Sequence, residues 1–192
     1  MAVMLTQCWH AVPGGTARSV LDLVGAVGRV GGADLVGVGP RGGAPDPAWA
    51  PPVPVVRTSL PLPFLYDAWH SLRRPSLPRS LGDVDVVHVT APVVPPVGGT
   101  PMVATVHDLF PVTRPDLLTR RGARLMRRGL ELVRDEAAVV MVPSRSVAAD
   151  CRDFGIGADR IRVVPWGVVP SSPGADDVAR VAERYSIDGP YV

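Results

Sequence analysis

Short apolar runs alternate with longer amphipathic segments along almost the whole chain, and this alternation constrains the fold more than any other feature. The apolar runs lie at residues 2–8, 33–39, 84–90, 101–107, 137–143 and 160–165. The segments with apolar residues at helical spacing lie at 16–30, 64–72, 116–134 and 144–154. Repeated strand–helix–strand order predicts an α/β, Rossmann-like doubly wound parallel sheet, because parallel strands need crossover connections. The nearly continuous apolar runs are typical of strands that helices cover on both faces.

The remaining stretches predict a surface loop, and they predict neither a transmembrane helix nor a signal peptide. The Pro-rich stretch Arg41–Pro63 is predicted as a long surface loop. Residues 86–106 carry no Asp, Glu, Lys or Arg, but four prolines and two glycines interrupt them. They therefore predict two strands around a turn instead of a transmembrane helix. The first ten residues lack the basic region and cleavage site of a signal peptide, so we expect a cytoplasmic protein with free thiols at Cys8 and Cys151.

Composition bounds the size of the protein and excludes several kinds of site. A length of 192 residues fits one domain, or one domain plus part of another. All 20 basic side chains are arginine, which excludes a P-loop and indicates a GC-rich, bacterial genome. The formal net charge of +2 gives no reason to expect a nucleic-acid partner. The stretch Gly37–Gly42 matches G-x-G-x-x-G, but it leads into prolines instead of opening a helix and is rejected as a dinucleotide site.

Histidines and one aspartate gather at the ends of predicted strands. His107 and Asp108 end the run that begins at Pro101, His88 lies near the end of the run before it, and His10 follows the first run. Ligands of doubly wound sheets bind beyond the carboxyl ends of the strands, where the strand order reverses. A single histidine is more often a hydrogen-bonded structural side chain, whereas several at equivalent positions favour a binding or catalytic site.

Two glycines follow the first strand and precede the first helix. Gly14 and Gly15 stand just before Thr16, where the helix is expected to begin. Glycines at such a place let backbone N–H groups come close to an anion, and the helix N-terminus favours negative charge. An ordinary tight turn explains the same two residues equally well.

The predicted helix at 116–134 has one strongly basic face. At about 100° per residue, six arginines share that face and apolar residues occupy the other. The basic residues are Arg120, Arg121, Arg124, Arg127, Arg128 and Arg134. A solvated outer face of a core-packed helix explains this pattern. The alternative is an electrostatic contact with an anionic membrane surface or an anionic acceptor.

Four stretches together carry a resemblance to a known family. They are "PGGTARSVLDLV", "DVVHV", "PMVATVHDLFP" and "AAVVMVPSRSVAADCRDFGIGADRIRVVPWGV". Their order and spacing resemble the amino-terminal domain of retaining GT-B glycosyltransferases of glycosyltransferase family 4. The resemblance implies that residues 1–168 form the acceptor-side, Rossmann-like half-domain of a GT-B enzyme. Residues 169–192 would then be a linker and the start of a missing carboxy-terminal domain, which holds the nucleotide-sugar donor.

The resemblance also implies roles for individual residues. His107 matches the family histidine that reaches the donor sugar and is expected to be catalytic. Gly14 and Gly15 match the glycine turn that approaches the donor diphosphate. The residues expected to face the acceptor are His10, Arg18, His88 and Asp108.

The implied ligands are a nucleotide-sugar donor and a sugar or lipid acceptor, without a cofactor or a metal ion. A peripheral contact with the inner face of the membrane would use one set of arginines. They are Arg120, Arg121, Arg124, Arg127 and Arg128. The chain departs from the family pattern at Trp166 and Val169, where the family commonly has Asn and Asp, and it lacks the family's pair of donor-binding glutamates eight residues apart.

The sequence therefore predicts the acceptor-binding half of a hexose-transferring enzyme that is inactive without its donor-binding domain. Two alternatives stay open. One is a stand-alone, non-catalytic binding module with the same fold. The other is half of an enzyme that resembles sugar-nucleotide epimerases.

Overall fold

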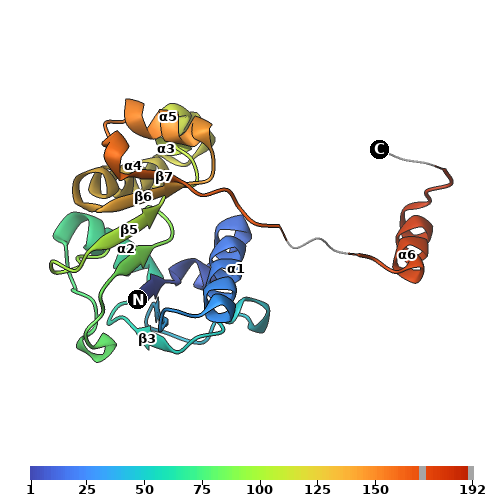
Figure 1. Ribbon diagram of the computed structural model, residues 1–192, viewed down its shortest axis with the longest axis horizontal. Helices are drawn as coiled ribbons and strands as arrows, with labels where there is room; N and C mark the ends of the chain where they lie inside the picture. The colour runs from blue at the N-terminus through green and yellow to red at the C-terminus, as the bar shows by residue number, and fades with distance from the viewer. Residues whose placement is uncertain (169–171, 190–192) are drawn as a thin grey trace.

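A computed structural model describes residues 1–168 and 172–189. The described residues contain a seven-stranded, entirely parallel sheet with the strand order β3-β2-β1-β4-β5-β6-β7 (Figure 1). The strands are β1 (Ala2–Met4), β2 (Val36–Gly39), β3 (Val55–Arg57), β4 (Val87–Val89), β5 (Met102–Thr105), β6 (Val139–Val142) and β7 (Ile161–Val163). The predicted α/β, Rossmann-like parallel sheet is confirmed.

Helices lie in every connection between successive strands except the one from β4 to β5, and they cover the sheet. The α-helices are α1 (Gly14–Val30), α2 (Leu62–Asp67), α3 (Phe110–Thr113), α4 (Arg120–Glu136), α5 (Arg145–Asp153) and α6 (Ala175–Tyr185). The short 3-10 helices are η1 (Thr6–Trp9), η2 (Pro47–Trp49), η4 (Arg79–Leu81), η5 (Pro115–Leu117) and η6 (Ala158–Arg160). A π-helical turn, η3 (Ala68–Leu72), continues α2. The predicted helices at 16–30, 64–72, 116–134 and 144–154 correspond to α1, α2 with η3, α4 and α5.

The strand order reverses between β1 and β4. From β1 the chain adds β2 and β3 on one side, and it then returns to place β4, β5, β6 and β7 on the other side. Such a reversal leaves a crevice at the carboxyl ends of the two strands, because their connections leave in opposite directions. The loops after β1 and β4 therefore meet beside the middle of the sheet.

Alternate residues of the strands pack on opposite faces of the sheet. Val3 and Leu5 belong to a buried cluster with α1, whereas Met4 belongs to a second cluster that includes Trp69 and Leu130. Burial of one large aliphatic side chain stabilises a fold by roughly 1.5–3 kcal/mol, so the two clusters together hold the helices on both faces.

Gly129 allows α4 to pack closely against the connection from β4 to β5, which contains Pro92. A Cβ atom at Gly129 would lie 1.7 Å from the carbonyl oxygen of Pro92 and 3.0 Å from Cε1 of His70. Only a residue without a side chain fits there. Two helices begin at residues whose side chains cap them. Thr119 accepts a hydrogen bond from the Gly122 N–H at the start of α4, and Ser144 accepts one from the Val147 N–H at the start of α5.

Two expectations from the sequence are wrong in detail, and one short helix was missed. The predicted loop Arg41–Pro63 contains the edge strand β3, which follows Pro54 directly. A proline fits at the start of an edge strand, because its missing N–H costs no ladder bond there. The first strand ends at Met4, and Thr6–Trp9 forms a 3-10 turn instead of its continuation. The short helix α3 was not expected.

The helix α6 stands away from the sheet (Figure 1), and none of its residues is buried. It falls in the segment that the sequence assigns to a linker and a second domain. Val169, one of the two departures from the family pattern, lies outside the described residues. Among the described residues, no helix has the length and apolar content that a membrane span requires.

Candidate functional site

Thr90 joins the loops that meet at the reversal of strand order. Its hydroxyl donates to the carbonyl oxygen of Met4 at 2.5 Å and accepts from the Gln7 side-chain amide at 2.5 Å. Its own carbonyl oxygen lies 3.0 Å from Nε2 of His107. One residue after β4 therefore ties the ends of β1 and β5 together. The carboxyl edge of β1, β4 and β5 is a single hydrogen-bonded unit.

The His107 ring has a defined orientation and tautomer. Because a carbonyl oxygen only accepts, Nε2 of His107 must carry the hydrogen that it shares with Thr90. In the neutral ring, Nδ1 then holds the lone pair, and it has no hydrogen-bond partner among the described residues. The imidazole also stacks on the Trp166 indole, with the ring centroids 5.2 Å apart and the planes at 27°. The half-buried ring can thus accept a hydrogen bond from a ligand hydroxyl at Nδ1.

Tyr66 of α2 and His10 form a second polar group near the end of β1. The Tyr66 hydroxyl donates to Oγ1 of Thr6 at 2.9 Å, so the 2.8 Å contact with Nε2 of His10 must have the histidine as donor. Burial lowers the pKa of His10. Burial also raises the pKa of Tyr66, with the hydrogen bond to Thr6 opposing that rise. Both side chains are therefore neutral at pH 7 and suit an uncharged, hydroxyl-bearing ligand.

The glycine turn leaves open space in front of the N-terminus of α1. Gly14 has φ +65°, a conformation that favours glycine, and Pro13 before it provides no side-chain cap. No heavy atom lies within 4 Å of a Cβ atom built on Gly14 or Gly15. At Gly15, neither the backbone conformation nor the packing requires a glycine. The free N–H groups of this helix end can instead approach an anion closely.

The structure gives local partners to two other residues that the sequence assigns to the acceptor. Arg18 lies on α1, is 72% exposed at its side chain and pairs with Asp22 at 3.1 Å. Asp108 accepts from the Phe110 N–H at 2.9 Å in a local turn before α3, and its second carboxylate oxygen stays free for a ligand. Both are exposed near the ends of their elements.

His88 lies inside β4, and only 3% of it is exposed. Its Nε2 lies 2.8 Å from Oγ1 of Thr105, on the neighbouring strand. Burial, with a smaller effect of the nearby His107, lowers the pKa of His88 to about 4. A direct contact with an acceptor would need an accessible surface that His88 lacks here, so this geometry gives no support to that assignment.

Tyr66, Thr6 and Gln7 are the members of this region that the sequence did not single out. Two polar residues, Thr6 and Gln7, inside an otherwise apolar run were a signal of a strand end. Tyr66 gave no signal, because it reaches the site from a helix 56 residues further along the chain than its partner His10.

No group of three metal-ligating side chains occurs among the described residues. Burial raises the pKa of Cys8 and of Cys151 to about 11, which makes both thiols poor nucleophiles.

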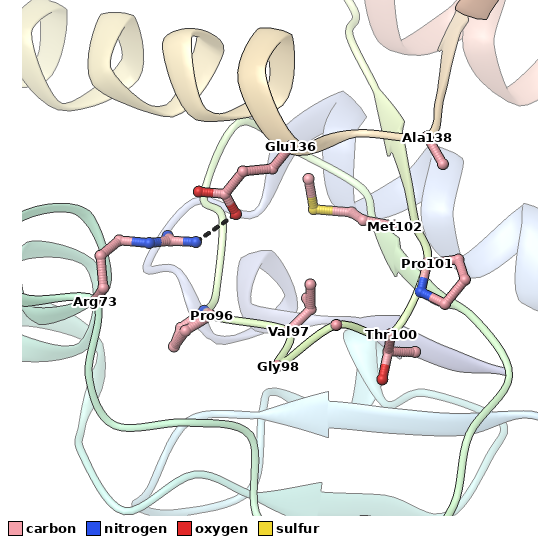
Figure 2. Close-up of a pocket in the computed structure, with 10 residues that line it drawn as sticks. Arg73, Pro96, Val97, Gly98, Thr100, Pro101, Met102, Glu136 and Ala138 are labelled. Carbon is pink, nitrogen blue, oxygen red and sulfur yellow. Dashed lines mark hydrogen bonds and ion pairs between the residues drawn. The ribbon is translucent and has the colours of Figure 1, made fainter.

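One cavity lies at the opposite, amino edge of the sheet (Figure 2). It measures about 410 Å³ and is lined by residues 96–102, which lead into β5, and by Arg73, Glu136 and Ala138. Figure 2 shows Arg73 and Glu136 pointing toward one another, at 2.5 Å. Arg73 also donates to the Val94 carbonyl oxygen at 2.9 Å. Arg73 and Glu136, the charged residues that line the cavity, already pair with one another. The cavity is therefore a structural feature of the connection between β4 and β5.

A basic groove lies between η3 and α4. It measures about 660 Å³ and is lined by Asp67, His70, Ser71, Arg121, Arg124, Leu125, Arg127, Arg128 and Glu131. Arg121 pairs with Asp67, and Arg127 and Arg128 pair with Glu131. Arg124 has no ion-pair partner among the described residues. The groove keeps an excess of positive charge that an anionic group could neutralise.

Comparisons with known proteins bear on the family and the fold of the chain. The model of glycosyltransferase family 4 matches residues 13–172. The fold is similar to HepE from Anabaena in complex with UDP and glucose, at 13% identity and a TM-score of 0.60 over 97% of this chain. It is also similar to a glycosyltransferase from Rickettsia africae, at 12% identity and a TM-score of 0.57 over 98% of this chain. The chain spans 50% of the HepE chain and 49% of the Rickettsia chain. No curated protein matches.

Proposed function

The chain belongs to glycosyltransferase family 4, and on that premise we propose that it forms the acceptor-side half of a retaining glycosyltransferase. The observation that carries the proposal is the convergence at the strand reversal. The glycine turn, the His107 ring and the His10–Tyr66 pair all lie at the carboxyl edge of the same parallel sheet. Ligands of such sheets bind at this edge.

The glycine turn is proposed to receive the donor diphosphate. The bond between the anomeric carbon and the diphosphate oxygen breaks, and negative charge develops on the departing nucleoside diphosphate. Free N–H groups at the N-terminus of α1 stabilise that charge, since the helix end carries a positive partial charge. Gly15 lets the diphosphate approach because no Cβ stands in its way.

His107 is proposed to contact the transferred sugar. Its Nε2–H is held by the Thr90 carbonyl oxygen, which leaves Nδ1 to accept from a sugar hydroxyl. The acceptor lies on the side of His10 and Tyr66, whose neutral groups bind hydroxyls without binding charge. The acceptor hydroxyl forms the new glycosidic bond, and its proton leaves with the diphosphate. Within this proposal Asp108 and Arg18 contribute to the acceptor surface, and the reaction proceeds without a metal ion or cofactor.

The donor nucleotide is proposed to need a second domain. HepE was solved with UDP-glucose, and this chain covers 49% of that HepE chain. A chain that supplies only the diphosphate turn and His107 would bind a nucleotide sugar in the millimolar range, because few contacts remain to offset the cost of association. We therefore expect the 192-residue chain alone to show neither transfer nor hydrolysis.

Two measurements test this proposal. Sequencing of the coding region beyond Val192 is expected to reveal a second α/β domain with two glutamates eight residues apart. A stop codon at that point would favour a stand-alone binding module. Calorimetry of the isolated chain with UDP-glucose is expected to show no binding tighter than millimolar. Micromolar affinity would place the donor site in this half and overturn the division of roles.

The basic face of α4 is proposed to contact an anionic membrane surface. It carries Arg120, Arg121, Arg124, Arg127 and Arg128, and the exposed apolar residues Leu117 and Leu118 precede it. Basic and apolar groups together are typical of an interfacial helix. Binding to phosphatidylglycerol vesicles, but not to phosphatidylcholine vesicles, is expected. It should weaken in the Arg120→Gln/Arg124→Gln variant and persist in the control Arg29→Gln/Arg41→Gln. Equal loss in both variants would indicate a general charge effect.

A further inference from the structure

Trp166 occupies a position that the proposed reaction has not yet used. It lies on the segment that leaves β7 and is anchored by the hydrogen bond from the Val164 N–H to the Val142 carbonyl oxygen at 2.8 Å. This segment passes over the carboxyl edge of the sheet, where the indole stacks on the His107 imidazole. Trp166 is 43% exposed, and its Nε1–H has no partner among the described residues. A large apolar ring is thus held beside His107 with part of its surface exposed.

The indole is larger than the imidazole stacked against it, and 43% of Trp166 stays exposed. The exposed part of the indole is an apolar surface edged by one N–H donor. A pyranose ring has a matching character, with C–H groups over one face and hydroxyls around its rim. Binding sites commonly combine such apolar walls with a few polar groups that fix orientation. Here Nδ1 of His107 is the polar group beside the wall.

We propose that Trp166 forms the aromatic wall of the sugar subsite: its indole stacks on the His107 ring, and the exposed part of the indole beside that ring faces the pyranose ring that His107 contacts. This inference rests on the proposed function, and it names the residue that selects for a flat, apolar sugar face. Trp166 is a specificity-determining residue, and it takes no part in bond making. At this position the resembled family commonly has Asn, which lacks such a face.

The test uses the 192-residue chain labelled with 5-fluorotryptophan, whose four tryptophans give four fluorine resonances. The variant Trp166→Phe removes one resonance and so assigns it. Trp49→Phe, in η2, is the matched control. The probes are UDP-glucose and UDP, both at millimolar concentration, and the amide resonance of Gly15 reports occupancy of the diphosphate turn. UDP-glucose is expected to shift the Trp166 resonance, whereas UDP is expected to shift only Gly15.

The other outcomes overturn the inference in distinguishable ways. A shift of Gly15 by UDP-glucose with no change at Trp166 would remove the aromatic wall but leave the proposed function intact. An equal shift of Trp166 by UDP would mean that the indole contacts the nucleotide. No shift of either residue by any probe would count against both the wall and the proposed function.

Kinetics on the transferase-active protein separate a wall from a mere support for His107. Trp166→Ala is expected to raise KM for the sugar donor on the order of tenfold with little change in kcat, because a uniform binding contact is lost. Trp166→Phe should restore most of the affinity, since it keeps an aromatic face. A fall in kcat at unchanged KM would instead show that Trp166 only positions His107, and would refute the wall.

Discussion

Acidification from pH 7 to pH 5 should destabilise the fold through two buried histidines. Burial lowers the pKa of His70 and of His88 from the ordinary 6.5 to about 4. Both rings are needed in their neutral form. His70 donates from Nδ1 to the Leu125 carbonyl oxygen at 3.1 Å, and its Nε2 accepts from the Val94 N–H at 3.0 Å. A proton on that Nε2 would remove the acceptor.

The sign and size of the effect follow from proton linkage. The folded pKa is depressed, so the stabilising contribution is complete above pH 6.5 and is lost as the pH falls toward 4. In that window the unfolded chain binds protons that the folded chain does not. Between pH 7 and pH 5, each histidine should lower the free energy of unfolding by roughly 1.5–2 kcal/mol, and the pair by roughly 3–4 kcal/mol. That is a large part of the 5–15 kcal/mol typical of a domain.

Urea unfolding at pH 7, 6 and 5, followed by far-ultraviolet circular dichroism, measures this dependence. The variant His70→Asn should be less stable than the parent at pH 7, but its loss between pH 7 and pH 5 should be smaller by roughly 1.5–2 kcal/mol. Thr119→Ala is the control, because loss of the α4 N-cap should cost about 1 kcal/mol at every pH. An unchanged pH dependence in His70→Asn would refute the assignment of the acid sensitivity to this buried ring.

Three further substitutions have distinct expected outcomes. Gly129→Ala should lower the unfolding free energy by roughly 1–3 kcal/mol in urea titrations, because its Cβ would meet the Pro92 carbonyl oxygen, whereas the exposed helical control Gly28→Ala should be neutral or stabilising. Gly15→Ala should leave stability unchanged in the same titrations and weaken nucleotide-sugar binding by the transferase-active protein, measured by calorimetry; a loss of stability would make the glycine structural. His107→Ala should lower turnover of the transferase-active protein by an amount equivalent to roughly 2–4 kcal/mol with little change in Tm, and a large drop in Tm with normal turnover would show that the residue is structural.

The sequence predicted the parallel sheet because its strands are buried on both faces and therefore read as apolar runs. It missed β3, because Pro51, Pro52 and Pro54 precede a strand of only three residues. At an edge, those prolines break no ladder bond, so the local signal for a loop was compatible with a strand. The same local signals could not show where β1 ends, since Thr6 and Gln7 turn away to meet Tyr66 and Thr90 from distant segments.

The candidate site, like the fold, could be predicted from the sequence only in part. His107 and the glycine turn stand at strand ends, which sequence periodicity locates, and the structure places both at the carboxyl edge. His88 shows the limit of that reasoning, because one step back along a three-residue strand moves a side chain from the edge into the core. The stacking of Trp166 on His107 depends on the path of the chain after β7, which no pattern in the sequence specifies.

The most direct test of the central claim is an amide chemical-shift map of the 192-residue chain with millimolar UDP-glucose. The account predicts shifts at the carboxyl edge of the sheet, in Gly14, Gly15, Thr90 and His107, and none at the amino-edge cavity around residues 96–102 and Glu136. Shifts confined to that cavity, with the glycine turn unchanged, would contradict the assignment of the sugar-nucleotide site to the strand reversal.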